Sequence, residues 1–154
     1  MKAVIQRVTS ASVEVDHETI GQIDEGLLVL LGAGKGDTEV DVTYMVEKIP
    51  HLRIFPDDQG KMNRSLFDVQ GQILLVSQFT LLGDTHRGRR PSFDQAAPTD
   101  KAQQLYDLAI ANFREKGLSV ETGRFGANML VSLKNNGPVT FILDSRKGES
   151  GKIN

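Results

Sequence analysis

The segment "SLKNNGPVTFILDS", residues 132–145, decides how the last third of the chain folds. Apolar residues at alternate positions on either side of its centre are typical of β-strands. The centre, Asn135 to Pro138, is not, because proline has no N–H to donate to a sheet ladder and glycine weakens a strand interior. The sequence therefore predicts two strands, near residues 128–134 and 138–143, with a break between them.

The bond between Gly137 and Pro138 offers a reason for this break. An X–Pro bond is the one peptide bond at which the cis form costs little, about 0.5–1 kcal/mol relative to trans. A cis bond rotates a carbonyl group away from the ladder, and glycine relieves the steric restriction on the backbone. Two adjacent carbonyl groups then point the same way and suit a positively charged amine. An ordinary bulge or an edge-strand interruption explains the same residues, so both interpretations stay open.

The other strands are predicted from apolar patterns that are either alternating or continuous. The run "GLLVLLGAG" is continuously apolar, so we expect this strand to be covered on both faces. The predicted strands cover residues 2–8, 11–15, 20–23, 26–34, 52–55, 72–81 and 118–121.

Two amphipathic helices are predicted between the strands. Asp37 has the position of an N-cap for the first helix, whose apolar residues end before Pro50. The second helix begins near Thr99 and ends at Gly117. The main elements follow the order βββαββαβββ, which favours an α+β fold with a mixed, barrel-like sheet core and two main helices. We expect one domain over residues 1–154, with a mobile polar tail at 145–154.

Composition limits the possible functions. The chain has no cysteine, which excludes disulfides and thiolate metal sites and fits a reducing, cytoplasmic setting. The three histidines share no ligand spacing, so we expect neither a metal nor a cofactor. The longest apolar run, "LLVLL", has the length of a strand, so no membrane segment is predicted. The net charge is −2, and any polyanion site must therefore be a local patch.

Three further features are candidate site residues, and each has a plainer interpretation. Polar residues end the buried strand in "VSQFTL", residues 76–81, either as a strand end emerging into solvent or as a site where N–H groups and hydroxyls meet a substrate. Arg7 is a charge in the largely apolar strand segment "VIQRV", and it pairs with a carboxylate such as Glu14 or contributes to a pocket. A basic cluster is either a solvated surface or a set of phosphate contacts: Arg87, Arg89 and Arg90.

Four segments together resemble the D-aminoacyl-tRNA deacylases, also called D-tyrosyl-tRNA deacylases. They are "MKAVIQRV", "SQFTL", "GDTHRGRRPSFDQAAP" and "NNGPVT", and the resemblance runs from Met1 to about Asp144. The segment "FGANMLVSLK", residues 125–134, is also similar, although the family often has Asp at the position of Asn128.

The resemblance implies a homodimer with composite active sites. The Gly137–Pro138 bond is expected to be cis and to reach from one subunit into the pocket of the other. The substrate implied is a D-amino acid, or glycine mischarged on tRNA-Ala, esterified to the 3′-terminal adenosine of tRNA. The implied catalytic residues are Ser77, Gln78, Phe79 and Thr80. Those implied for substrate binding and chiral selectivity are Gly137, Pro138, Arg7 and Met129, and the arginine cluster at 87–90 is expected to contact tRNA.

Ester hydrolysis passes through an oxyanion, for which the backbone N–H groups of Phe79 and Thr80 are natural donors. Attack comes either from the Thr80 hydroxyl, which needs an adjacent base, or from water assisted by the ribose 2′-OH. We favour water, because the motif offers no obvious side-chain base. The carbonyl pair at Gly137–Pro138 is expected to exclude L side chains by clash. Two rival functions are a non-catalytic RNA-binding module and a small-molecule hydrolase or deaminase at an oligomer interface.

Overall fold

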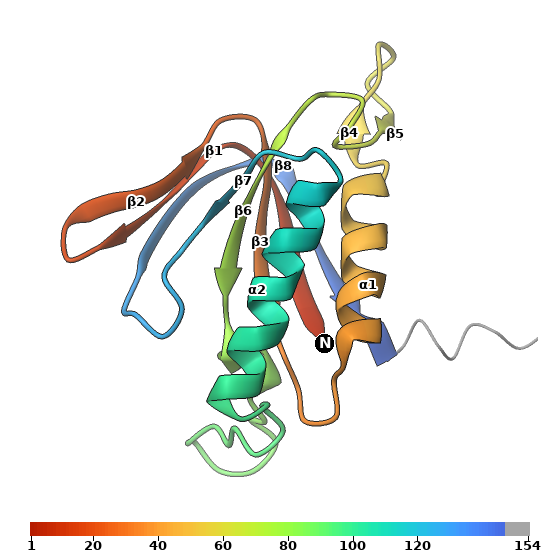
Figure 1. Ribbon diagram of the computed structural model, residues 1–154. Helices are drawn as coiled ribbons and strands as arrows, with labels where there is room; N and C mark the ends of the chain where they lie inside the picture. The colour runs from red at the N-terminus through yellow and green to blue at the C-terminus, as the bar shows by residue number, and fades with distance from the viewer. Residues whose placement is uncertain (147–154) are drawn as a thin grey trace, which may run out of the picture.

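The computed structural model describes residues 1–146 as a mixed β-sheet with two helices packed on one of its faces (Figure 1). The helices are α1 (Glu39–Lys48) and α2 (Thr99–Glu115), and two short 3-10 helices are η1 (Ile49–His51) and η2 (Phe79–Leu82). The strands are β1 (Lys2–Val15), β2 (Glu18–Ile23), β3 (Gly26–Gly32), β4 (Phe55–Pro56), β5 (Met62–Arg64), β6 (Gln72–Ser77), β7 (Val120–Thr122) and β8 (Leu130–Asp144).

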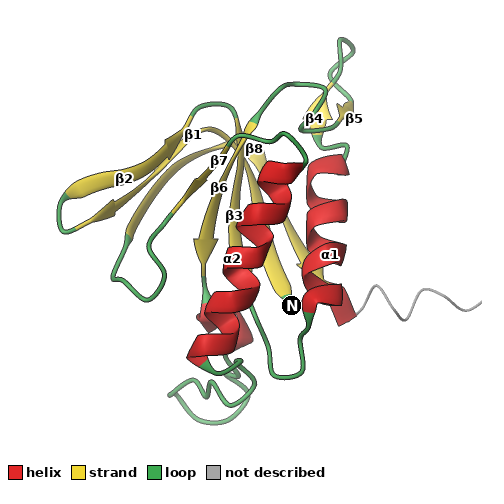
Figure 2. Cartoon of the chain, viewed as in Figure 1, coloured by secondary structure: helices red, strands yellow, loops and turns green. Residues whose placement is uncertain are grey.

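The long strand β1 organises the sheet. Its first half pairs with β3 and its second half with β2, while β8 runs antiparallel along both halves. The strands β3, β6 and β7 are parallel to one another, and the order is β2-β1-β3-β6-β7. The sheet curls until β2 approaches β7, since a Cβ atom added at Gly21 would lie 2.6 Å from the carbonyl oxygen of Thr122. The predicted α+β fold with a nearly closed, barrel-like mixed sheet is therefore confirmed (Figure 2).

Two apolar layers cover the opposite faces of the sheet. Leu27 and Val29 of β3 pack beneath the helices in a cluster that includes Phe113 of α2. The residue between them, Leu28, faces the other way and packs with Leu74 of β6. Adjacent strand residues point to opposite faces, so a strand covered on both sides must be continuously apolar, as "GLLVLLG" is.

The first helix begins one residue later than predicted. Thr38 is its N-cap, and the Asp41 side chain completes a capping box. Asp37 was the wrong choice because its carboxylate is fully buried, 2.7 Å from the N-terminal ammonium group of Met1. Burial raises the pKa of the Asp41 carboxyl, but hydrogen bonds from Ser145 and Thr38 outweigh burial and hold that pKa below its usual value.

The end of the chain is partly fixed by the same network. The Ser145 side chain is buried and accepts a hydrogen bond from the N-terminal ammonium group at 2.8 Å. Ser145, the first residue of the predicted mobile tail, is therefore held by hydrogen bonds to Met1 and Asp41. The rest of the predicted tail, 147–154, lies outside the described residues.

Several strand boundaries also differ from the prediction, and the observed order is βββαβββαββ. Residues 2–8 and 11–15 form one strand, and the predicted strands 128–134 and 138–143 are joined in β8, which begins at Leu130. Both merge because β1 and β8 remain paired on each side of an irregular register. Of residues 52–55 only Phe55 is in a strand, and the predicted strand 72–81 ends at Ser77.

Candidate active site

The end of β6 presents two backbone N–H groups that have no hydrogen-bond partner among residues 1–146. Ser77 pairs with Leu31 of β3, and the N–H of Gln78 donates to the Leu31 carbonyl at 2.9 Å. The chain then turns into η2, whose first residues are Phe79 and Thr80. Within residues 1–146 neither of these two N–H groups donates a hydrogen bond, as expected for the first turn of a helix. The strand end therefore offers an adjacent pair of N–H groups.

The side chains around this turn provide no base for Thr80. The Gln78 amide donates to the Thr80 hydroxyl, and an amide does not accept a proton at neutral pH. The nearest histidine in sequence, His86, is exposed and is hydrogen-bonded to Asp84 at 2.6 Å. The backbone N–H and ring of His86 hold the pKa of the Asp84 carboxyl below its usual value.

A cavity of about 460 Å³ adjoins the turn. Ser77, Gln78, Phe79 and Met129 all line it, so the structure brings these four predicted residues together. The remaining walls come mainly from small residues of the loop before α2, from α2 itself and from the segment before β8. The cavity is therefore apolar on most sides and carries polar backbone on one.

Two aromatic residues of the cavity were not predicted. Tyr106 of α2 and Phe125 lie with ring centroids 5.9 Å apart. The Tyr106 hydroxyl donates to the Leu75 carbonyl at 2.8 Å, and burial raises the pKa of this phenol above its usual value. Tyr106 is thus a protonated wall residue and not a base. Its place in the apolar stripe of α2 is indistinguishable in sequence from a core position.

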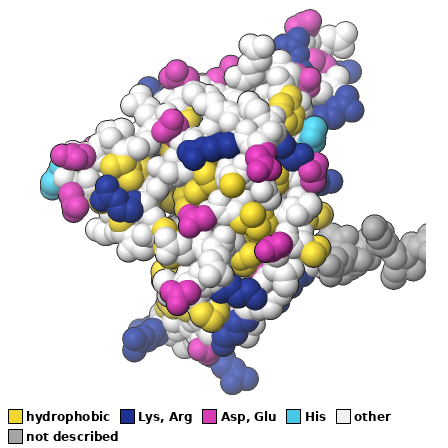
Figure 3. Space-filling view, in the orientation of Figure 1, with side chains coloured by type: hydrophobic (Ala, Val, Ile, Leu, Met, Phe, Trp, Pro, Cys, Tyr) yellow, Lys and Arg dark blue, Asp and Glu magenta, His cyan; other side chains and the backbone are white. Residues whose placement is uncertain are grey.

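The predicted basic cluster lies on the loop that follows η2. The backbones of Asp84 and Ser92 pair at 2.7 and 2.9 Å, and the segment between them carries the exposed Arg87, Arg89 and Arg90. Figure 3 shows Lys and Arg side chains projecting at the lower end of the molecule, where this loop lies in Figure 1. The cluster is therefore a local basic patch close in sequence to the turn at 77–80.

The Gly137–Pro138 bond is cis and lies in a bulge of β8 opposite Arg7. Gln6 pairs with Thr140 but Val8 pairs with Asn135, so β8 has more residues than β1 across this interval. Gly137 has a φ of +147°, and an added Cβ would lie 2.9 Å from the backbone nitrogen of residue 139. Only glycine both adopts this positive φ readily and leaves out the Cβ atom that would clash.

Arg7 holds this bulge in place. Its Nε donates to the Asn136 carbonyl at 2.8 Å, and its Nη1 donates to the Ile54 carbonyl at 2.6 Å. The side chain is buried, with 9% of the residue exposed. The predicted pairing with Glu14 is wrong in the described structure, because the guanidinium is used by backbone carbonyl groups.

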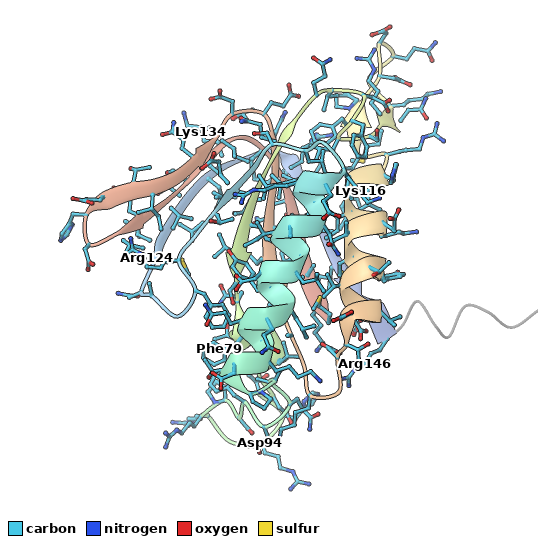
Figure 4. All side chains as sticks on the ribbon, in the orientation of Figure 1. Phe79, Asp94, Lys116, Arg124, Lys134 and Arg146 are labelled. Atoms are coloured by element: carbon cyan, nitrogen blue, oxygen red, sulfur yellow. The ribbon has the colours of Figure 1, made fainter. Side chains whose placement is uncertain are left out.

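A single chain does not bring the turn at residues 77–80 close to the bulge at Gly137–Pro138. Ser77 of β6 pairs with Leu31 of β3, which in turn pairs with Ala3 of β1. The bulge lies opposite Arg7 of β1, four residues further along that strand. Four residues correspond to about 13 Å along a strand, and the three strand spacings from β6 to β8 add roughly 14 Å across the sheet. In Figure 4 Phe79 lies near the lower end of the sheet and Lys134 near the upper end. Gly137 and Pro138 are therefore remote from the cavity of their own chain.

Within residues 1–146, no group of three His, Asp or Glu side chains is arranged to hold a metal ion. In the same part of the chain no helix has the length and apolar character needed to cross a membrane.

Comparison with known proteins gives consistent matches over nearly the whole chain. A family model described as D-Tyr-tRNA(Tyr) deacylase matches residues 4–144. The D-aminoacyl-tRNA deacylase of Thermosipho africanus is 56% identical over 147 residues, covering 96% of this chain and 99% of the relative. That of Bacillus pumilus is 58% identical over 147 residues, covering 96% of this chain and 100% of the relative.

Solved structures show the same fold. The c-Myc DNA Unwinding Element Binding Protein is 44% identical with a TM-score of 0.88, covering 94% of this chain and 98% of that chain. A probable eukaryotic D-amino acid tRNA deacylase has a TM-score of 0.78 at 20% identity, covering 93% and 98%, and this likeness concerns the fold alone.

Proposed function

The chain belongs to the D-Tyr-tRNA(Tyr) deacylase family and is a hydrolase of aminoacyl-tRNA ester bonds, and from this premise we propose a chiral proofreading activity. It releases D-amino acids, and glycine mischarged on tRNA-Ala, while leaving L-aminoacyl-tRNA intact. The observation that carries this proposal is the adjacent pair of N–H groups at Phe79 and Thr80, which have no hydrogen-bond partner within residues 1–146 and follow the cavity-lining residues Ser77 and Gln78. Preorganised donors of this kind stabilise the oxyanion of ester hydrolysis.

The cavity suits the end of a tRNA acceptor strand. Its volume of about 460 Å³ is within the usual range for small-ligand pockets, and its aromatic walls suit a planar base. With the terminal adenosine bound there, the ester carbonyl at the ribose 3′ oxygen reaches the N–H groups of Phe79 and Thr80. The patch at Arg87, Arg89 and Arg90 then contacts phosphates of the tRNA.

Water is the attacking group in this mechanism. The only described partner of the Thr80 hydroxyl is the Gln78 amide, so no side-chain base activates it as a nucleophile. The ribose 2′-OH beside the ester is both a donor and an acceptor. It takes part in moving the proton of the attacking water toward the departing 3′ oxygen. The products are the free amino acid and tRNA.

The site is completed by a second copy of the chain. Gly137 and Pro138 are exposed and remote from the cavity of their own chain. Large apolar side chains of the same strand are also exposed, including Ile142 at 79% and Leu130 at 64%. Exposed apolar side chains along a strand favour burial against another protein surface. A homodimer buries this strand and brings Gly137–Pro138 to the partner's cavity.

The partner's Gly137 and Pro138 carbonyl groups hold the α-amine of the substrate. In that position they occupy the space that an L side chain requires, so L substrates are rejected by clash. A D side chain points outward, and glycine has no side chain to exclude. This activity belongs in the cytoplasm, where translation uses aminoacyl-tRNA.

The test is ester loss from D-Tyr-tRNA, L-Tyr-tRNA and Gly-tRNA-Ala incubated with the purified protein. We expect rapid loss from the first and third substrates and none from the second. Equal loss from D and L substrates contradicts chiral selection. Binding without turnover indicates an RNA-binding module, and efficient hydrolysis of free D-tyrosine ethyl ester indicates a small-molecule hydrolase.

A further inference from the structure

The bulge of β8 is closed by one side chain that none of the preceding steps uses. The Asn135 amide nitrogen donates to the Val139 carbonyl at 3.2 Å and to the Thr140 hydroxyl at 3.0 Å. The Asn135 amide oxygen accepts from the Val139 N–H at 2.7 Å. These three hydrogen bonds join the two ends of the segment that contains Gly137 and Pro138.

These bonds replace the strand pairing that the bulge removes. A bulge leaves backbone groups without ladder partners, so neighbouring strands do not fix its shape. An asparagine side chain carries one acceptor and two donors, which matches the needs of a peptide group. In this structure it satisfies both the N–H and the carbonyl of Val139. The Val139 side chain is itself buried, which anchors that end of the bulge.

The neighbouring Asn136 does none of this with its side chain. Within residues 1–146 its amide makes no hydrogen bond, and only its backbone carbonyl is used, as the acceptor for Arg7. The side chain of Asn136 is exposed. The two asparagines therefore form a matched pair in which one amide holds the bulge and the other does not.

We propose that Asn135 is a positioning residue for the deacylation reaction, an inference that rests on the function proposed above. Its hydrogen bonds join the two ends of the bulge and thereby fix the direction in which the carbonyl groups of Gly137 and Pro138 face the partner's cavity. Asn135 touches no reacting atom. Its loss lets the carbonyl pair rotate, which weakens both the hold on the α-amine and the clash with an L side chain.

The substitutions Asn135→Ala, Asn135→Asp and Asn136→Ala separate this role from general stability. Asn135→Ala removes all three hydrogen bonds, whereas Asn135→Asp keeps an acceptor for the Val139 N–H and loses the two donor bonds. The aspartate variant therefore tests the two donor bonds, because a carboxylate oxygen takes the place of the nitrogen 3.2 Å from the Val139 carbonyl. Asn136→Ala is the control for a changed asparagine at the adjacent position.

The first readout is kinetic and uses D-Tyr-tRNA and L-Tyr-tRNA with each dimeric, folded variant. We expect kcat on the D substrate to fall at least about tenfold in both Asn135 variants, because several hydrogen bonds are lost together. The ratio of D to L turnover should fall as well, while Asn136→Ala keeps both values. An unchanged D to L ratio in folded Asn135→Ala, or an equal defect in Asn136→Ala, overturns the proposal.

The second readout does not depend on activity. Hydrogen exchange at the Val139 amide should speed up in Asn135→Ala and stay slow in Asn136→Ala. Slow exchange in both variants overturns the structural part of the inference. If the wild-type protein shows no D-selective hydrolysis, the proposed function fails, whereas exchange still reports whether Asn135 closes the bulge.

Discussion

Replacing Phe79 by proline removes one of the two unpartnered N–H groups and changes little else in the backbone. Phe79 is the first residue of η2, and Gln78 before it is outside the helical region, with φ −141° and ψ 81°. Proline is favoured at the first position of a helix because its fixed φ suits the turn and the missing N–H bonds nothing there. No described hydrogen bond is lost, since the Phe79 N–H donates to no residue among 1–146.

The magnitude follows from the role of that donor. Removing one donor from an oxyanion hole lowers kcat by about 10²–10³, or roughly 2.7–4 kcal/mol of transition-state stabilisation. The control is Phe79→Ala, which keeps the N–H and removes only the ring. That ring packs edge-to-face on Phe93 with centroids 5.0 Å apart, and such a pair contributes about 0.5–1.5 kcal/mol to stability. Even if that whole contribution were lost from the transition state, the rate would fall by only about tenfold, so we expect the alanine variant to stay within that factor of wild type.

The assay is single-turnover loss of D-tyrosine from D-Tyr-tRNA at saturating protein, with thermal unfolding and sedimentation as checks of fold and assembly. The expected order of rates is wild type, then Phe79→Ala, then Phe79→Pro far below both. A folded Phe79→Pro that reacts at the wild-type rate refutes the assignment of this N–H group to the oxyanion.

Three other expectations concern the attacking group, the RNA contact and the fold. Thr80→Ala should keep substantial activity with no acyl-enzyme in mass spectrometry, and a 2′-deoxy terminal adenosine should slow hydrolysis sharply; a covalent adduct on Thr80 contradicts this. Replacing Arg87, Arg89 and Arg90 together by alanine should weaken tRNA binding. Each phosphate contact on a single strand contributes roughly 0.7 to the steepness of log K against log salt, so the loss of three contacts should reduce that steepness by about 2; an unchanged slope indicates that the tRNA is bound elsewhere. Asp37→Asn removes the carboxylate 2.7 Å from the buried N-terminal ammonium group and leaves it only the Asp41 carboxylate at 4.0 Å, so urea unfolding should show a loss of up to about 3–5 kcal/mol; wild-type stability contradicts the buried ion pair.

Much of the fold followed from local patterns in the sequence. The continuous apolar run of β3 and the stripe of α2 predicted elements close to those observed, because burial on two faces or on one imposes distinct spacings. The merged strand β8 did not follow, since its continuity depends on pairing with β1 on both sides of the bulge. Pairing between segments more than a hundred residues apart leaves no local signal.

The same contrast holds for the site. The polar residues after β6 stood out because they end a buried strand, and the motifs pointed to a family that the comparisons confirm. Tyr106 and Phe125 did not stand out, because a cavity wall and a core position require the same apolar character. Asp37 was mistaken for a helix cap because its partner is the N-terminal ammonium group, which spacing does not reveal.

Gly137–Pro138 of one chain is proposed to complete the site at residues 77–80 of another, and the sharpest test of this shared site is a mixed dimer. Gly137→Ala places a Cβ 2.9 Å from the nitrogen of residue 139 at a φ of +147°, so it should distort the bulge. Two tags allow isolation of a dimer with Gly137→Ala on one chain and Phe79→Pro on the other. One of its two sites then has both the turn at 77–80 and Gly137–Pro138 intact, and we expect D-Tyr-tRNA hydrolysis at about half the wild-type rate, although each mutant homodimer is nearly inactive. A mixed dimer no more active than the mean of the two homodimers contradicts a site shared between chains.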